Sequence, residues 1–191
     1  MAKIVGKYLR FVLLVVTGLA LVSCATYKPV DEAFHEALNF PYVLDSGDRI
    51  RITVFGQTDL SNGYSVDKSG HIAFPLIGSV AARGQTPKQL EGIIAAKLKN
   101  GYIRDPDVSA EIERYRPFFI MGEVNAAGQY SYVPGMTLQN AIAVAGGFSP
   151  RASQENADVT RQVNGSIVTG RVPLSDPIIP GDTIYVRERL F

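Results

Sequence analysis

Residues 42–55 read YVLDSGDRIRITVF and decide how the folded part of the chain begins. The polar run Asp45-Ser46-Gly47-Asp48 predicts a tight turn. After this turn, Ile50, Ile52 and Val54 alternate with polar neighbours, which is the pattern of a half-buried strand. The chain therefore enters its fold as a turn followed by a β-strand.

The same kind of pattern continues to residue 113. Asp67-Lys68-Ser69-Gly70 predicts a hairpin turn between two strands. Thr86, Pro87 and Gln89 predict the start of a helix, because Thr86 and Gln89 can form a capping box and proline suits the first helical position. The strands are expected at 49–55, 64–66, 71–74, 76–80 and 107–113, and the apolar face of the helix at Leu90, Ile93, Ile94 and Leu98.

A second unit is predicted from Phe118 onward. Thr137 can cap a short helix with an apolar face, and Gly146-Gly147 can end it. Asn164-Gly165 is a strong hairpin signal. The expected strands are 118–124, 129–133, 158–162, 166–172 and 183–187, and the helix face is Leu138, Ala141, Ile142 and Ala145. The fold class is therefore α+β, with two small β-rich units that each carry a short helix.

One motif occurs in both units. Ser46-Gly47-Asp48 precedes the first strand, and Pro180-Gly181-Asp182 precedes the last. A Gly-Asp pair makes a good tight turn before any strand, so the repetition does not by itself indicate a duplication.

The N-terminus predicts a secreted lipoprotein. Lys3, Lys7 and Arg10 form a positive leader, residues 11–22 are uncharged, and Leu21-Val22-Ser23-Cys24 has the form of a lipobox. We expect cleavage between Ser23 and Cys24 and lipidation of the Cys24 thiol. A transmembrane anchor is the alternative, but the uncharged stretch is shorter than the ~20 residues that a spanning helix usually needs.

These observations divide the chain into four parts. Residues 1–23 are the expected signal peptide, 24–41 a lipidated tether with a short helix over 31–38, 42–113 the first unit and 114–191 the second. Ala25 follows the cysteine, and by resemblance to enterobacterial sorting rules this favours the outer membrane, with the protein facing the periplasm.

The composition excludes several classes of protein. Cys24 is the only cysteine, so an internal disulfide is excluded, and no basic run points to nucleic acid. His35 and His71 stand alone, and we expect no metal, no cofactor and no catalytic residue. A glycan hydrolase needs two convergent carboxylates. Six aspartates are available for this role, and nearly all of them lie in turn contexts: Asp45, Asp48, Asp67, Asp105, Asp107 and Asp182.

Taken in order, the motifs resemble the bacterial polysaccharide export family, the Wza-like outer-membrane auxiliary lipoproteins. The first unit resembles its export-signature domain through residues 42–48, 52–55, 66–67, 70–72, 75–78, 84–86 and 105–108. The second unit resembles its soluble-ligand-binding β-grasp (SLBB) domain through residues 122–124, 128–130, 138–142 and 145–147. Larger members have a second SLBB domain and a C-terminal amphipathic helix, so the chain resembles the short members.

The resemblance implies a non-enzymatic export component. Identical subunits would form a periplasmic ring that conducts polysaccharide, together with an inner-membrane co-polymerase (of the tyrosine-kinase or chain-length-determinant type) and, for short members, a separate outer-membrane β-barrel. A monomeric glycan-binding lipoprotein is the rival hypothesis. Five tyrosines could contact glycan, although core or interface packing is the expected role of Tyr64, Tyr102, Tyr115, Tyr130 and Tyr132.

Overall fold

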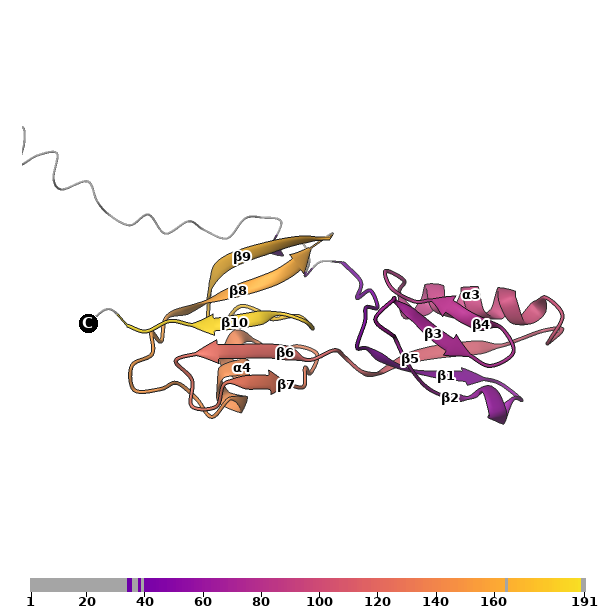
Figure 1. Ribbon diagram of the computed structural model, residues 1–191, viewed down its shortest axis with the longest axis horizontal. Helices are drawn as coiled ribbons and strands as arrows, with labels where there is room; N and C mark the ends of the chain where they lie inside the picture. The colour runs from indigo at the N-terminus through magenta and orange to yellow at the C-terminus, as the bar shows by residue number, and fades with distance from the viewer. Residues whose placement is uncertain (1–33, 36–37, 39, 164, 190–191) are drawn as a thin grey trace, which may run out of the picture.

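The computed structural model describes residues 34, 35, 38, 40–163 and 165–189 (Figure 1). The first unit is built on a three-stranded antiparallel sheet of order β2-β1-β5. Its strands are β1 (Arg49–Val54), β2 (Asn62–Ser65) and β5 (Val108–Arg114). A two-stranded hairpin, β3 (His71–Phe74) with β4 (Gly78–Ala81), and helix α3 (Pro87–Lys99) complete it. A short 3₁₀ turn, η1 (Thr58–Leu60), follows β1.

The local signals for α3 are confirmed. Thr86 Oγ1 accepts a hydrogen bond from the Gln89 N–H, and the Gln89 side chain accepts one from the Thr86 N–H, which is the predicted capping box. Leu90, Ile94 and Leu98 are fully buried, while Ile93 is half-buried beside them. They share one apolar cluster with the buried residues of β1, and α3 packs against β5, so the helix covers one face of the sheet.

The expected hairpin between strand 64–66 and strand 71–74 is wrong in its pairing. The turn at Asp67–Gly70 forms, but β2 pairs with β1 and β3 pairs with β4. The next strand begins at Gly78 rather than at residue 76, because Leu76 adopts a left-handed conformation, with φ +68°, in the β3–β4 turn. The turn redirects the chain into a separate hairpin.

The second unit is a five-stranded sheet of order β7-β6-β10-β8-β9 with helix α4 (Leu138–Val144) on one face (Figure 1). The strands are β6 (Phe118–Gly122), β7 (Gly128–Tyr130), β8 (Asn156–Val163), β9 (Ser166–Pro173) and β10 (Thr183–Val186). β6 and β10 are parallel and the other pairs antiparallel. The predicted α+β class is thus confirmed.

Each unit has its own apolar core. The first is centred on Ile50, Ile52 and Leu90, and the second on Phe118, Ile184 and other residues after 117. Phe34 is the exception, because it precedes the first unit in the chain and is buried in the core of the second. Of the helix expected over 31–38, the structure describes residues 34, 35 and 38, and it places Phe34 and His35 in a helix.

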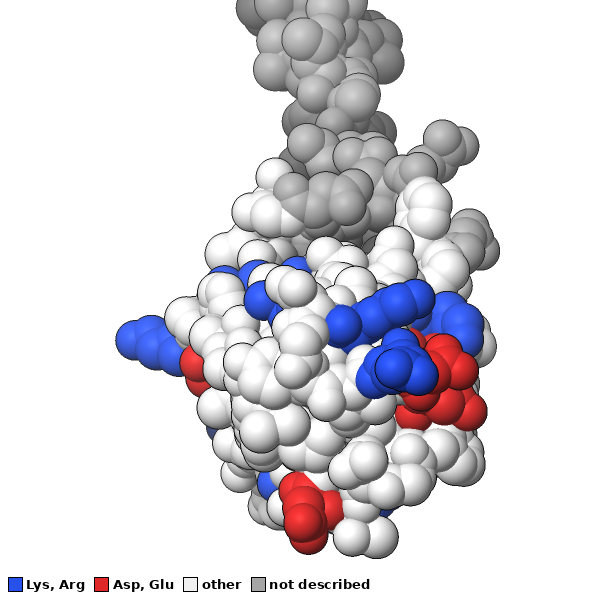
Figure 2. Space-filling view, turned by 90° about the vertical axis from the view of Figure 1, so that its right-hand side faces the viewer, with Lys and Arg blue, Asp and Glu red and all other residues white. Residues whose placement is uncertain are grey.

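The end of the first unit that points away from the second is largely uncharged. Figure 2 looks onto this end and shows a mostly white surface, with Lys and Arg across its upper part and Lys, Arg, Asp and Glu together on its right-hand part. No helix among the described residues combines the length and the apolar character needed to cross a bilayer.

Candidate functional site at the junction of the two units

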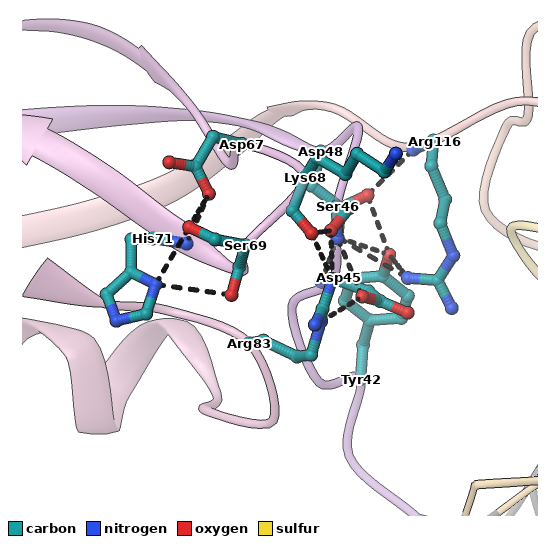
Figure 3. Close-up of polar contacts among 10 residues, drawn as sticks. All are labelled: Tyr42, Asp45, Ser46, Asp48, Asp67, Lys68, Ser69, His71, Arg83 and Arg116. Carbon is teal, nitrogen blue, oxygen red and sulfur yellow. Dashed lines mark hydrogen bonds and ion pairs between the residues drawn. The ribbon is translucent and has the colours of Figure 1, made fainter.

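The predicted lipidation site, Cys24, and the cleavage position after Ser23 both lie outside the described residues. The polar groups that the structure does bring together lie where the two units meet. They come from the turn before β1, from the β4–α3 connection and from the link between β5 and β6, and Figure 3 shows them.

Asp48 is the centre of this junction. Its carboxylate is completely buried and accepts hydrogen bonds from the Asp45 N–H (2.8 Å), the Arg116 N–H (2.7 Å) and the Tyr42 hydroxyl, which lies 2.8 and 2.7 Å from its two oxygens. Burial raises the pKa of Tyr42 far above its ordinary value, so the phenol remains a donor. A buried charge held by this many donors is the arrangement that a low-dielectric environment requires.

Arg116 connects the two units. Its guanidinium donates to the Tyr42 hydroxyl at 2.7 Å and approaches Asp48 at 3.5 Å. The side chain also packs against one glycine of each unit. A Cβ added to Gly47 of the first unit would lie 3.4 Å from Arg116 Cβ, and a Cβ added to Gly181 of the second unit would lie 2.8 Å from Arg116 Nε. The two Gly-Asp turns found in the sequence therefore both contact one arginine.

Aromatic rings bridge the same junction. Tyr115, beside Arg116, makes edge contacts with Tyr42 of the first unit (5.0 Å between centroids) and with Tyr132 of the second (5.5 Å). Such pairs contribute about 0.5–1.5 kcal/mol each beyond their buried area. The link residues Tyr115 and Arg116 thus contact both units: hydrogen bonds and a ring contact reach the first, and a ring contact and the approach to Gly181 reach the second.

A second group of polar residues fixes the turns beside Asp48. Arg83 donates to Asp45 Oδ1 (2.8 Å), to the Lys68 carbonyl (3.0 Å) and to the Ser46 hydroxyl, and so joins two turns of the first unit. Within one of those turns, Asp67 accepts from the Ser69 hydroxyl (2.6 Å) and from the His71 N–H (2.9 Å). These bonds lower the pKa of Asp67, with the Ser69 hydrogen bond the main cause.

In the second unit, Asp182 and Arg161 form a fully buried ion pair. Two hydrogen bonds of 3.0 and 2.7 Å join the two side chains. Arg161 also donates a hydrogen bond to the Phe34 carbonyl (3.0 Å), and its guanidinium lies 4.1 Å from the centre of the Phe34 ring. Burial raises the pKa of Asp182, and the bonds from Arg161 act in the opposite direction. Next to Phe34, the ring of His35 lies 3.0 Å from Asp176. Phe34 and His35 are therefore both held by residues of the second unit.

The sequence did not reveal these roles. The turn interpretation holds for Asp67, but Asp48 and Asp182 are also the buried charges that organise the junction and the second core. A signal for Arg161 was present, since the alternation of β8 places it on the same inward face as Ala157 and Val159. No sequence pattern linked Arg116 or Phe34 to its contacts.

The tyrosines mostly pack, as expected. Tyr64 stacks on Phe74 and donates to the Leu60 carbonyl, while Tyr130 stacks on Phe118 and donates to the Ala126 carbonyl. Tyr102, just after α3, is exposed.

Two hollows lie near these groups. One, of about 200 Å³, is at the junction and is lined by Asp45, Arg116, Gln162, Ile179, Pro180, Gly181 and Asp182. The other is an open cleft of about 580 Å³ at one end of the second sheet, lined by residues 152–156, Arg171 and residues 187–189. Across the part of the chain that the structure describes, no three His, Cys, Asp or Glu side chains are placed to hold a metal ion.

Fold and junction thus define a protein of two small α+β units joined by a link that contacts both, and the sequence matches follow this division. Residues 36–113 match the polysaccharide biosynthesis/export protein family, and residues 117–171 match the SLBB domain. The chain belongs to the polysaccharide export family, and within it one SLBB match follows the export match.

Two kinds of relative were found. The chain is 34% identical over 91 residues to the exopolysaccharide production protein ExoF of Rhizobium meliloti, an alignment that covers 47% of this chain and 22% of that protein. It is 30% identical over 164 residues to the polysialic acid transport protein KpsD of Escherichia coli, covering 79% of this chain and 29% of that protein. The chain therefore spans less than a third of the length of either relative.

Proposed function

We propose that this protein is a non-enzymatic, lipid-anchored component of a polysaccharide export machine, which forms a ring of identical subunits on the periplasmic side of the outer membrane and conducts capsular or exopolysaccharide. In this proposal, residues 1–23 are a signal peptide and 24–41 a lipidated tether, while 42–113 and 114–191 are the export-signature and SLBB domains. An inner-membrane polysaccharide co-polymerase and, where one is needed, a separate outer-membrane β-barrel protein are the expected partners.

The observation that carries the proposal is the fixed junction between the two matched domains. A ring closes only if every subunit repeats the same rotation, so a two-domain subunit must keep one internal angle. The bond from the Arg116 N–H to the buried Asp48, the approach of the Arg116 side chain to Gly181 and the ring contacts of Tyr115 with Tyr42 and Tyr132 support that constancy. A flexible linker of the same length would let each subunit adopt a different angle and would oppose closure.

The first test is export itself. Deletion of the gene should abolish secreted polysaccharide while the repeat units are still made, and the wild-type gene should restore it. Normal amounts of polymer in the medium of the deletion strain would refute the export role.

Sedimentation of the acyl-free protein, alone and with the periplasmic part of its co-polymerase, separates a ring from a monomeric glycan-binding lipoprotein, because only the ring predicts an assembly.

The second test concerns the anchor. Cys24→Ser removes the thiol that accepts the lipid, and should release the protein from the membrane fraction and reduce export, because stable attachment takes two or more acyl chains. Ser23→Ala is the matched control, since it keeps a small residue before the cysteine and should leave membrane association unchanged. A Cys24→Ser protein that stayed fully membrane-bound and fully active would contradict the lipid anchor.

A further inference from the structure

One face of the SLBB sheet has no covering element among the described residues. The other face packs on α4 and carries the core, including Phe118, Ile120 and Ile184. Because side chains alternate along a strand, the neighbouring residues of β6 and β10 point to the opposite side. Figure 1 shows α4 on one side of the sheet only.

The strand pairing arranges this open face in two rows. In one row, Phe119 of β6 lies between Gln129 of β7 and Thr183 of β10, followed by Thr160 and Thr169. In the next row, Met121 is paired with Tyr185, followed by Asp158 and Arg171. Strands lie about 4.8 Å apart and successive residues on one face about 6.6 Å apart, so the two rows form a continuous platform.

One half of the platform is apolar and exposed. Phe119, Met121 and Tyr185 are 43, 46 and 47% exposed, although they are large hydrophobic side chains on neighbouring strands. Each is therefore half-buried by its neighbours and presents the rest of its surface to solvent. Contiguous exposed apolar surface of this kind marks a binding site more often than isolated exposed residues do.

The other half is polar and already ordered. The hydroxyls of Thr160 and Thr169 are 2.9 Å apart, and Asp158 holds both Arg171 (3.0 Å) and Arg187 (2.5 Å). Arg171 and Arg187 also line the 580 Å³ cleft, so the platform continues into that cleft. A guanidinium has five N–H donors, so the half-exposed Arg187 can donate to a ligand while it keeps its bond to Asp158.

We propose that this platform, Phe119, Met121 and Tyr185 with the adjoining polar row, is a binding site for a glycan chain that lies flat on the sheet. A pyranose has an apolar C–H face and a rim of hydroxyls. Phe119 and Tyr185 receive the apolar faces, and Thr160, Asp158 and Arg187 exchange hydrogen bonds with the hydroxyls. This site rests on the proposed function, because it assigns a surface to the exported polymer.

The charges of the site favour a ligand recognised by its hydroxyls rather than by its net charge. The cleft and its edge hold equal numbers of opposite charges: the arginines are Arg151, Arg171, Arg187 and Arg189, and the carboxylates are Glu123, Glu155, Asp158 and Glu188. Opposed charges in equal number leave little net field for a polyanion. Binding should therefore change little with salt, whereas contacts between exposed charges weaken as salt screens them.

The openness of the platform also sets the strength of binding. A deep pocket encloses most of its ligand, whereas a flat face covers only one side of a sugar. Affinity per subunit should therefore be weak and exchange fast, which suits a surface along which a polymer must move. A second copy of the chain is the competing occupant, and it predicts instead that the same residues control assembly.

The test uses the full mature chain with Cys24→Ser and, as probe, oligosaccharides cut from the polysaccharide that the source strain secretes. The variant is Phe119→Ala with Tyr185→Ala. The matched control is Val144→Ala, an exposed side chain on α4, at the opposite side of the sheet. Calorimetric titration should show roughly tenfold or greater loss of affinity in the double variant. The control should bind as the parent does, and affinity should be the same at low and high salt.

Several results would overturn this site. They are absence of binding by the parent chain, unchanged binding by the double variant, or a steep loss of binding in salt. A double variant that changes the sedimentation behaviour of the protein would assign the face to contacts between copies instead. Because both side chains are half-exposed, the thermal unfolding midpoint should stay close to that of the control, which checks folding. Polymer that is still exported by the deletion strain would refute the export role. Loss of export in that strain, together with unchanged glycan binding by the double variant, would refute only the platform.

Discussion

Replacing Asp48 by Asn tests whether the junction depends on a buried carboxylate or only on its shape. Asparagine has nearly the same volume, but one carboxylate oxygen becomes an NH₂ group. Both oxygens of Asp48 accept hydrogen bonds, one from the Arg116 N–H and the other from the Asp45 N–H. In either orientation of the amide, a donor therefore faces a buried donor.

The cost can be worked out from these contacts. A hydrogen bond to a charged group contributes about 1.5–3 kcal/mol, and leaving a buried donor unpaired costs a further ~1–3 kcal/mol. The Asp48→Asn variant would keep part of the network through its amide oxygen, so we expect a net loss of about 3 kcal/mol in the free energy of unfolding. Since marginal stability is about 5–15 kcal/mol, this is a large fraction of the total.

The assay is urea unfolding of the acyl-free protein followed by circular dichroism and by tyrosine fluorescence. Asp45→Asn is the matched control, because its partner Arg83 is half-exposed and a pair of that kind contributes less than about 1 kcal/mol. If Asp48→Asn lowers the free energy of unfolding no more than Asp45→Asn does, burial of the Asp48 carboxylate does not stabilise the junction.

Three further predictions concern single positions. Gly122→Ala should destabilise the second unit by about 3 kcal/mol or more, because Gly122 has a φ of +88° and an added Cβ would lie 2.1 Å from the Val186 carbonyl oxygen. A melting temperature equal to that of the parent would contradict this prediction. Leu76→Gly should raise stability by about 1 kcal/mol in urea unfolding, since it relieves a left-handed leucine that is 56% exposed, and a loss would mean that its packing matters more. The pKa of Asp67 is lowered in the folded protein, so the ionised carboxylate stabilises the fold. This contribution to the free energy of unfolding is complete above the ordinary carboxyl pKa and is lost as the pH falls through the lowered value. The unfolding curves of the parent and Asp67→Asn should therefore differ at neutral pH and converge in strong acid, and a constant difference would refute the link to ionisation of Asp67.

The elements that the sequence predicts well are those whose signals are local. Both capping boxes lie within four residues, so the starts of α3 at Thr86 and of α4 at Thr137 could be identified without knowing the rest of the fold. The alternation of Ile50, Ile52 and Val54 likewise determines which face of β1 is buried.

The failures come from interactions between distant residues. The turn at Asp67–Gly70 was recognised, but whether β2 pairs with β3 or with β1 depends on how the sheet is assembled. In the same way, the turn role of Asp48 was local, while its contact with Arg116 joins residues 68 positions apart. A single sequence shows that a residue is polar, but not that its partner lies in the distant link between two domains.

The burial of Phe34 in the second core determines the order in which this protein can be completed during synthesis. The ribosome delivers Phe34 first and Val186, another residue of the same core, near the end, with the whole first unit between them. The first core contains no described residue beyond Ile112 and can form on the emerging chain, as N-terminal domains generally do. The second core must wait, so a chain interrupted after β5 would hold a folded first unit and an aromatic side chain whose partners have not yet been made.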